Sequence, residues 1–188
     1  MRRGWVFLPI ERRVLYLGYA GRVFRQPRPL PIRMNTASRF VVFLVEGGRY
    51  AVRLEEVERV VAAVELVPLP DAPAVVLGVF NLQGAVVPAI DTRRRLRLPE
   101  REPGISDHFL VVRAAGRILA LVADRVQGIG EMPAEAVSPA SDVVPELAGV
   151  EGVLRLPDGV VVIHDLARFL SAEDGLQLDV AQRRQVTA

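Results

Sequence analysis

The chain has 188 residues, of which 51% are hydrophobic, and a formal net charge of +2. This length suits one domain or two small ones closely joined, and the apolar share is enough to bury a sizeable core. Cysteine is absent, which excludes a disulfide framework, thiolate chemistry and a cysteine-ligated metal site.

An arginine-rich arm begins the chain. Residues 1–33 contain eight arginines and one acidic residue, whereas the rest contains sixteen arginines and 21 acidic residues. The basic pI therefore comes from the arm, and the globular part lacks the electrostatic footprint of a nucleic-acid binder. Arginines interrupt every apolar run of the arm, which argues against a signal peptide and a transmembrane helix.

Three interpretations of the arm remain. Aromatic residues alternate with its arginines and would suit a nucleic acid or an anionic surface. Prolines close the arm, as is typical of an unstructured tail, and Met34 is an alternative start of the protein. We assign residues 1–37 to this arm and expect the folded domain to begin between Met34 and Phe40.

Short strands and tight turns follow the arm. Residues 40–45 form an apolar strand, residues 49–54 alternate as a second strand, and a glycine-containing turn lies between them. Residues 78–82 and 85–90 flank Gln83-Gly84, where glycine accepts a positive φ, and this predicts a buried hairpin.

Two residues refine this hairpin. Pro88 lacks an N–H group, which favours an edge or bulge position for the second strand. Asp91 follows the second strand and is placed to cap a short helix with its carboxylate.

The second half of the sequence repeats the first. Residues 108–129 match residues 40–61 as an apolar strand, a Gly-Arg turn, a second strand and a charged stretch with valines. Residues 161–170 match residues 87–96, with Asp165 at the position of Asp91. A polar segment at 99–107 separates the halves. Repeated units of short strands favour small closed barrels, because closure removes exposed strand edges.

The sequence contains no recognisable catalytic set. It has no P-loop, dinucleotide fingerprint or nucleophile elbow, and its two histidines, His108 and His164, suit structural positions. His164 with Asp165 supplies too few ligands for a metal. We predict that the protein is not an enzyme, with no catalytic, cofactor-binding or metal-binding residue and no cofactor. The basic run of Arg93, Arg94, Arg95 and Arg97 fits a solvated helix face or a contact to an acidic partner.

The motif GVFNLQGAVVPAIDTR at residues 78–93 resembles the signature of the CheW family, the adaptors of bacterial chemosensory arrays. Residues 40–61, 118–140 and 160–170 resemble other segments of the family, so the similarity covers about residues 38–173. It implies a mainly β fold of two intertwined SH3-like five-stranded β-barrel subdomains, with short helices and a C-terminal helix. The approximate boundary of the subdomains would lie near 99–107, and residues 174–188 would form a tail.

The resemblance also implies a function. The chain would be a non-catalytic, cytoplasmic scaffold associated with membrane receptor arrays. It would couple the cytoplasmic tips of methyl-accepting chemoreceptors to a CheA-type histidine kinase, without nucleic acid and without direct membrane insertion. The alternatives are an adaptor of a non-flagellar pathway such as pilus motility, a detached CheA or CheV domain, for which the chain is short, and an anion or nucleic-acid binder acting through the arm.

The family's protein-binding positions carry over to Val57, Gly78, Asn81, Gln83, Gly84 and Val126. For the valines and glycines among them, packing and turn geometry are equally good explanations. Gln83 stands where the family usually has arginine, and Thr92 where it has leucine. The first departure affects partner affinity or partner identity rather than the fold.

Overall fold

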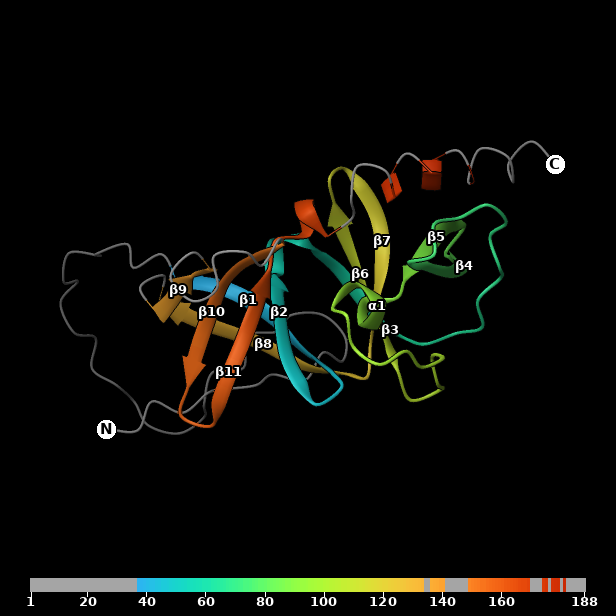
Figure 1. Ribbon diagram of the computed structural model, residues 1–188. Coiled ribbons are helices and arrows are strands. Elements are labelled where there is room, and N and C mark those ends of the chain that lie inside the picture. The colour runs from blue at the N-terminus through green and yellow to red at the C-terminus, as the bar shows by residue number, and fades with distance from the viewer. Residues whose placement is uncertain are drawn as a thin grey trace, which may run out of the picture.

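The computed structural model describes residues 37–133, 136–140, 149–169, 174–175, 177–179 and 181. The predictions for the N-terminal arm, apart from its last residue, and for most of the C-terminal tail lie outside these residues. Figure 1 shows two β-sheets side by side, with α1 on the side of the sheet that contains β3–β7.

The first half forms β1 (Ala37–Val45), β2 (Gly48–Arg53), η1 (Leu54–Glu56), β3 (Val57–Ala62), β4 (Val76–Leu82), β5 (Ala85–Ile90) and α1 (Thr92–Arg95). The second half forms β6 (His108–Ala114), β7 (Arg117–Ala123), β8 (Arg125–Pro133), β9 (Val137–Pro139), β10 (Val150–Leu156), β11 (Gly159–His164) and η3 (Leu166–Arg168). Among the described residues, no helix is long and apolar enough to cross a bilayer.

Each sheet takes strands from both halves of the sequence. One has the order β8-β1-β2-β11-β10-β9, and the other has the order β3-β6-β7-β5-β4. The opening hairpin of each half thus lies beside the closing hairpin of the other half, through the parallel pairs β2–β11 and β5–β7. The mainly β fold with two subdomains is confirmed. The short strand β9 adds a sixth strand to the sheet in which five were expected.

Three hairpins share one turn geometry. Glu46, Gln83 and Ala115 have φ values of 51°, 55° and 48°, and each is followed by a glycine with positive φ. Two successive positive φ values are the pattern of type I′ turns, whose twist matches that of the flanking strands. Left-handed φ is unfavourable for residues with a Cβ, so these first turn positions carry a local strain.

The edge position predicted from Pro88 is wrong. β5 lies between β4 and β7, and the register shift of its hairpin falls between Val76 and Gly78. Val79, opposite Pro88, directs its own N–H and C=O to Val67, so this pair has no hydrogen bond across β4–β5. The nitrogen of Pro88 therefore faces β7, where parallel pairing starts only at Ala89. An interior strand tolerates proline here because no partner requires its N–H.

The largest core cluster lies between the sheets. It combines Val41 and Phe43 of β1 with Leu110 of β6 and Leu119 and Leu121 of β7, all less than 1% exposed. The strands of the two halves therefore bury apolar surface against one another. The two helix caps predicted after the closing hairpins are confirmed: Asp91 accepts from the amide of Arg94 at 3.0 Å, and Asp165 accepts from that of Ala167 at 2.9 Å.

Candidate protein-binding site

The tip of the β4–β5 hairpin is the most exposed part of the predicted site. Asn81, Gln83 and Gly84 are all exposed. The Oδ1 of Asn81 accepts a hydrogen bond from the amide of Gly84 at 2.7 Å, so its side chain fixes the turn. The side chain of Gln83 is left to project from the tip.

Arg59, which the sequence analysis did not select, reaches this tip. It lies on β3, and its Nη1 donates to Oε1 of Gln83 at 3.0 Å, with both residues exposed. β3 and β4 are the two end strands of the five-stranded sheet, so this side-chain contact joins the two ends of the sheet. A guanidinium therefore stands beside position 83 although the residue at 83 is uncharged.

Apolar surface adjoins the polar tip. Ala85 and Val86 follow the turn on β5, and the side chain of Val86 is 57% exposed. Val86 pairs with Asn81 across the hairpin. The hairpin supplies an amide and exposed methyl groups, and β3 adds the charged group of Arg59. This combination suits the recognition of a protein surface, in which polar and apolar contacts are mixed.

Val57 and Val126 have a different environment from the tip. Both are half-buried and pack against the core cluster between the sheets. Val57 begins β3 and pairs with Val112 of β6, whereas Val126 lies on β8, opposite Phe43 of β1. They therefore belong to different sheets and offer only part of their surface to solvent.

Gly78 is buried and has a clear structural role. Its φ is 154°, and a Cβ at this position would lie 2.6 Å from the carbonyl oxygen of Val67. Backbone hydrogen bonds join Val67 to Val79, the residue of β4 that follows Gly78. Glycine is thus required at position 78, because a side chain there would prevent the segment that contains Val67 from pairing with β4.

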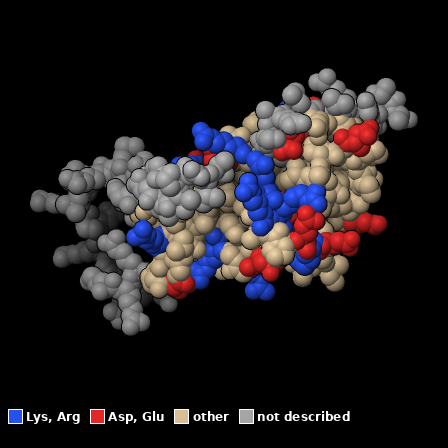
Figure 2. Space-filling view, viewed as in Figure 1, with Lys and Arg blue, Asp and Glu red and all other residues tan. Residues whose placement is uncertain are grey.

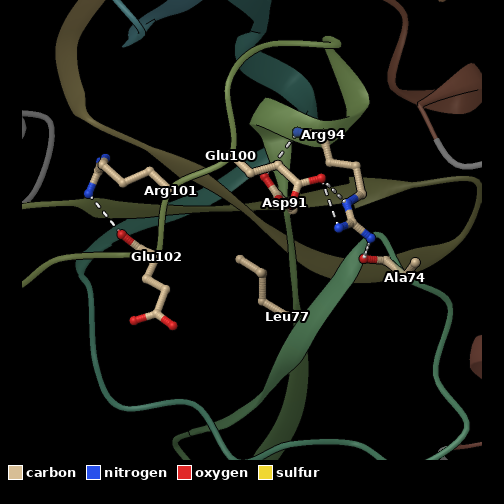
Figure 3. Close-up of a pocket in the computed structure, with 7 residues that line it drawn as sticks. All are labelled: Ala74, Leu77, Asp91, Arg94, Glu100, Arg101 and Glu102. Atoms are coloured by element: carbon tan, nitrogen blue, oxygen red, sulfur yellow. Dashed lines mark hydrogen bonds and ion pairs between the residues drawn. The ribbon is translucent and has the colours of Figure 1, made fainter.

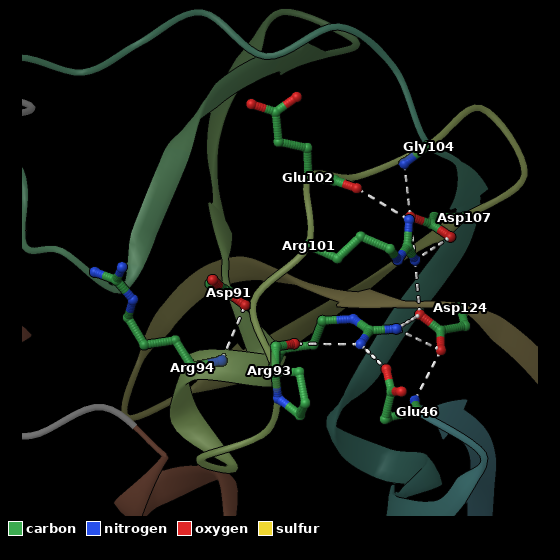
Figure 4. A network of polar contacts seen from close by, with 10 residues as sticks. Glu46, Asp91, Arg93, Arg94, Arg101, Glu102, Gly104, Asp107 and Asp124 are labelled. Atoms are coloured by element: carbon green, nitrogen blue, oxygen red, sulfur yellow. Dashed lines mark hydrogen bonds and ion pairs between the residues drawn. The ribbon is translucent and has the colours of Figure 1, made fainter.

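A network of charged side chains joins the two sheets (Figure 4). Arg93 of α1, whose side chain is only 10% exposed, donates from Nη2 to both carboxylate oxygens of Asp124 at 2.7 and 2.8 Å and also pairs with Glu46. Arg101 donates to Asp124 at 2.8 Å and to Asp107 at 2.9 Å. The turn of β1–β2, α1, the inter-half segment and the β7–β8 junction meet in this network, so Arg93 does not belong to a solvated face.

Electrostatics at Asp124 follow from this network. Partial burial raises the pKa of its carboxyl, but hydrogen bonds from Arg93, the Glu46 amide and Arg101 outweigh it and lower the pKa below its ordinary value. Asp124 is therefore held ionised between the sheets.

A small cavity of about 260 Å³ lies beside α1, and Arg101 of the network is among the residues that line it (Figure 3). Arg94 extends along it and donates to the carbonyl of Ala74 at 2.9 Å and to Glu100 at 3.0 Å. Asp91, which also lines it, is engaged in the cap of α1. In the part of the chain that the structure describes, no three His, Asp or Glu side chains are grouped to hold a metal ion.

His164 has a packing environment. It is 6% exposed and lies between the rings of Tyr50 and Phe169, with ring centroids 5.7 Å away in each case. Its Nδ1 donates to the carbonyl of Gly149 at 3.1 Å, and burial lowers its pKa. This agrees with the structural role expected from the sequence.

Comparisons with known proteins agree on one family. A family model described as a CheW-like domain matches residues 39–174. The chain is 28% identical over 142 residues to the chemotaxis protein CheW of Rhizobium meliloti, covering 74% of this chain and 92% of that protein. It is 30% identical over 112 residues to the protein FrzA of Myxococcus xanthus, covering 60% and 70% of the two chains. The crystal structure of the scaffolding protein TtCheW from Thermoanaerobacter tengcongensis has a TM-score of 0.67 at 24% identity and covers 73% of this chain and 95% of that one.

Proposed function

Because the chain belongs to the CheW-like family, we propose that it is a non-catalytic adaptor of a chemosensory array that couples chemoreceptor tips to a CheA-type histidine kinase. The observation that supports this function most directly is the family match, because residues 39–174 span the strands of both sheets. The protein would act in the cytoplasm, at the receptor array.

The exposed hairpin tip is the proposed partner contact. Gln83, Asn81 and Val86 project from the β4–β5 hairpin, with Arg59 beside them. Val57 on β3 and Val126 on β8 would add the exposed parts of their side chains as further contacts, and Gly78 and Gly84 shape the backbone. An adaptor must hold two partners at once, and the two similar sheets give it two separate faces on one rigid core.

A sedimentation assay tests the proposal. Receptor-containing membranes and purified kinase are mixed with and without the full chain, and the kinase in the pellet is measured. We expect the wild-type chain to retain kinase. If kinase in the pellet does not depend on the chain, the adaptor function is wrong.

Two equivalent valines supply a matched pair of variants. Val86 and Val160 are each the second residue after a hairpin turn, on β5 and β11, and their side chains are 57% and 52% exposed. Val86→Arg should lower retention, because a charge enters the proposed contact, and Val160→Arg should lower it less. Equal loss in both, with unchanged melting curves, would show that the β4–β5 tip is not the partner contact.

A non-flagellar pathway is the second candidate. It is supported by the similarity to protein FrzA of Myxococcus xanthus, which this chain shows beside its similarity to proteins named CheW. The same sedimentation assay, run with receptors and kinases from each type of pathway of the source cell, separates the two by which pair the chain joins.

A further inference from the structure

The short helices that end the two halves lie side by side. α1 follows β5 and η3 follows β11, and an aspartate caps each of them. Nη2 of Arg95, the last residue of α1, donates to the carbonyl oxygen of Arg168 on η3 at 3.0 Å. The repeat thus brings arginines from sequence-distant segments to one place, which Figure 2 shows as basic side chains gathered over α1 and η3.

The structure sorts these arginines into two groups. Arg93 is enclosed in the network between the sheets, and Arg94 is held by Glu100 and Ala74. Arg97 and Arg168 are exposed and Arg95 is half-buried, and we call these three the arginine surface.

The arginine surface has weak internal compensation. The side chain of Arg168 is 76% exposed, and its nearest carboxylate, that of Asp165, lies 3.5 Å away. Arg95 is 4.0 Å from Asp174. Arg97 is exposed and has a φ of 57°, its amide donates to the carbonyl of Arg94 at 3.1 Å, and its guanidinium makes no hydrogen bond or ion pair with any described residue. Guanidinium donors therefore face solvent with unused capacity.

We propose that the arginine surface binds an acidic segment of a partner protein. A guanidinium presents a planar fork of N–H donors that matches a carboxylate with two parallel hydrogen bonds. Three such forks, from the end of α1, from the turn after it and from η3, would orient an extended chain bearing alternate acidic side chains.

The surroundings favour carboxylates over a nucleic-acid backbone. Asp165, Asp174 and Glu100 border the arginine surface, and the sequence after residue 33 carries an excess of five acidic residues. A continuous phosphate chain would extend over these acids, whereas a peptide can place neutral or basic residues opposite them.

This surface is distinct from the hairpin tip. α1 follows the end of β5 that is remote from the Gln83 turn, and a strand of six residues spans about 20 Å. The proposal therefore goes beyond the adaptor contact, and it does not depend on it.

Weak binding of this kind is measured by an NMR titration of the ¹⁵N-labelled full chain. The probe is a short peptide of alternating glutamate and serine. A glutamine–serine peptide and a single-stranded oligothymidylate of equal charge serve as comparison probes. We expect the acidic peptide alone to shift amide signals of α1 and η3 and to bind more weakly as salt rises.

Charge reversal identifies the side chains. The double variant Arg97→Glu/Arg168→Glu should weaken the acidic peptide roughly tenfold, since exposed ion pairs contribute about twofold to fivefold each. Arg39→Glu/Arg155→Glu reverses two exposed arginines on β1 and β10 and should leave the affinity nearly unchanged. Arg97→Gln/Arg168→Gln repeats the test if reversal impairs folding.

Three results would overturn the proposal. They are no shift with the acidic peptide, an equal loss of affinity in both double variants, and an oligothymidylate affinity equal to that of the peptide. The second would indicate a general charge effect, and the third an anion surface without preference for carboxylates.

Discussion

Arg59 and Gln83 should act as one unit in partner binding. The guanidinium of Arg59 is held 3.0 Å from Oε1 of Gln83 at the exposed tip. From the sequence alone, Gln83→Arg is expected to tighten binding to a family-typical partner, because it adds the missing charge. The structure changes this expectation, since a positive charge is already present and depends on Gln83 for its position.

The magnitude follows from the geometry. Two guanidiniums about 4 Å apart in water repel by about 1 kcal/mol, so an arginine at position 83 would displace Arg59. Gln83→Arg alone should therefore change the dissociation constant by less than about twofold. Arg59→Ala should weaken binding by about 1–1.5 kcal/mol, which is roughly fivefold to tenfold, because it removes a charged donor. Arg59→Ala/Gln83→Arg should recover most of that loss.

Isothermal titration of the four proteins against purified kinase and a receptor cytoplasmic fragment completes this cycle. Arg155→Ala, an exposed arginine on β10, is the control for general loss of charge. All variants should unfold within about 0.5 kcal/mol of wild type, as is usual for exposed residues. Additive effects of the two substitutions would refute the coupling, and no effect of any of them would place the tip outside the interface.

Three further predictions concern stability. Asp124→Asn should lower the free energy of unfolding by about 1–3 kcal/mol at neutral pH, by removing the ionised acceptor of Arg93 and Arg101. Because the folded pKa of Asp124 is lowered, its contribution is present above about pH 4 and is lost as pH falls through the folded value, so urea melts of both proteins should converge in acid. Ala115→Asn should raise the free energy of unfolding by up to about 1 kcal/mol in the same melts, because asparagine tolerates the φ of 48° better than alanine. An unchanged or lower free energy of unfolding would contradict the strain at this turn. Residues 34–103 and 104–188, expressed separately, should each lack a cooperative melt and regain one when mixed; cooperative unfolding of either fragment alone would contradict the exchange of hairpins between halves.

Features that depend on neighbouring residues could be read from the sequence. The hairpin turn at Gln83-Gly84 and the caps at Asp91 and Asp165 each involve groups within three residues, and all are present. The internal repeat was also visible, because equivalent turns and caps recur in the same order.

Features that depend on the pairing of distant segments could not be read in this way. Arg59 contacts Gln83 only because the two end strands of the five-stranded sheet curve toward each other, and Arg93 meets Glu46 only because the two sheets pack together. A basic run offers no signal that its first arginine is buried while the third and fourth are not. Pro88 was misjudged for the same reason, since its tolerance depends on where pairing with β7 begins.

The exchange of hairpins also bears on how an adaptor can transmit a constraint. β5 pairs with β7 of the other half at Ala89 and Ala120, and α1, directly after β5, delivers Arg93 to Asp124 and Glu46. The hairpin that presents Gln83 is thus fixed at its base to both sheets, by parallel pairing on one side and by ion pairs on the other. If each half had closed its own barrel, the two sheets would meet only through surface contacts and could hinge about the inter-half segment. Because each sheet contains hairpins from both halves, the two halves of the sequence cannot separate without breaking sheet pairing. The two sheets cannot separate without opening the common core and breaking the ion pairs of Arg93, so a partner bound at the tip would act on one connected body.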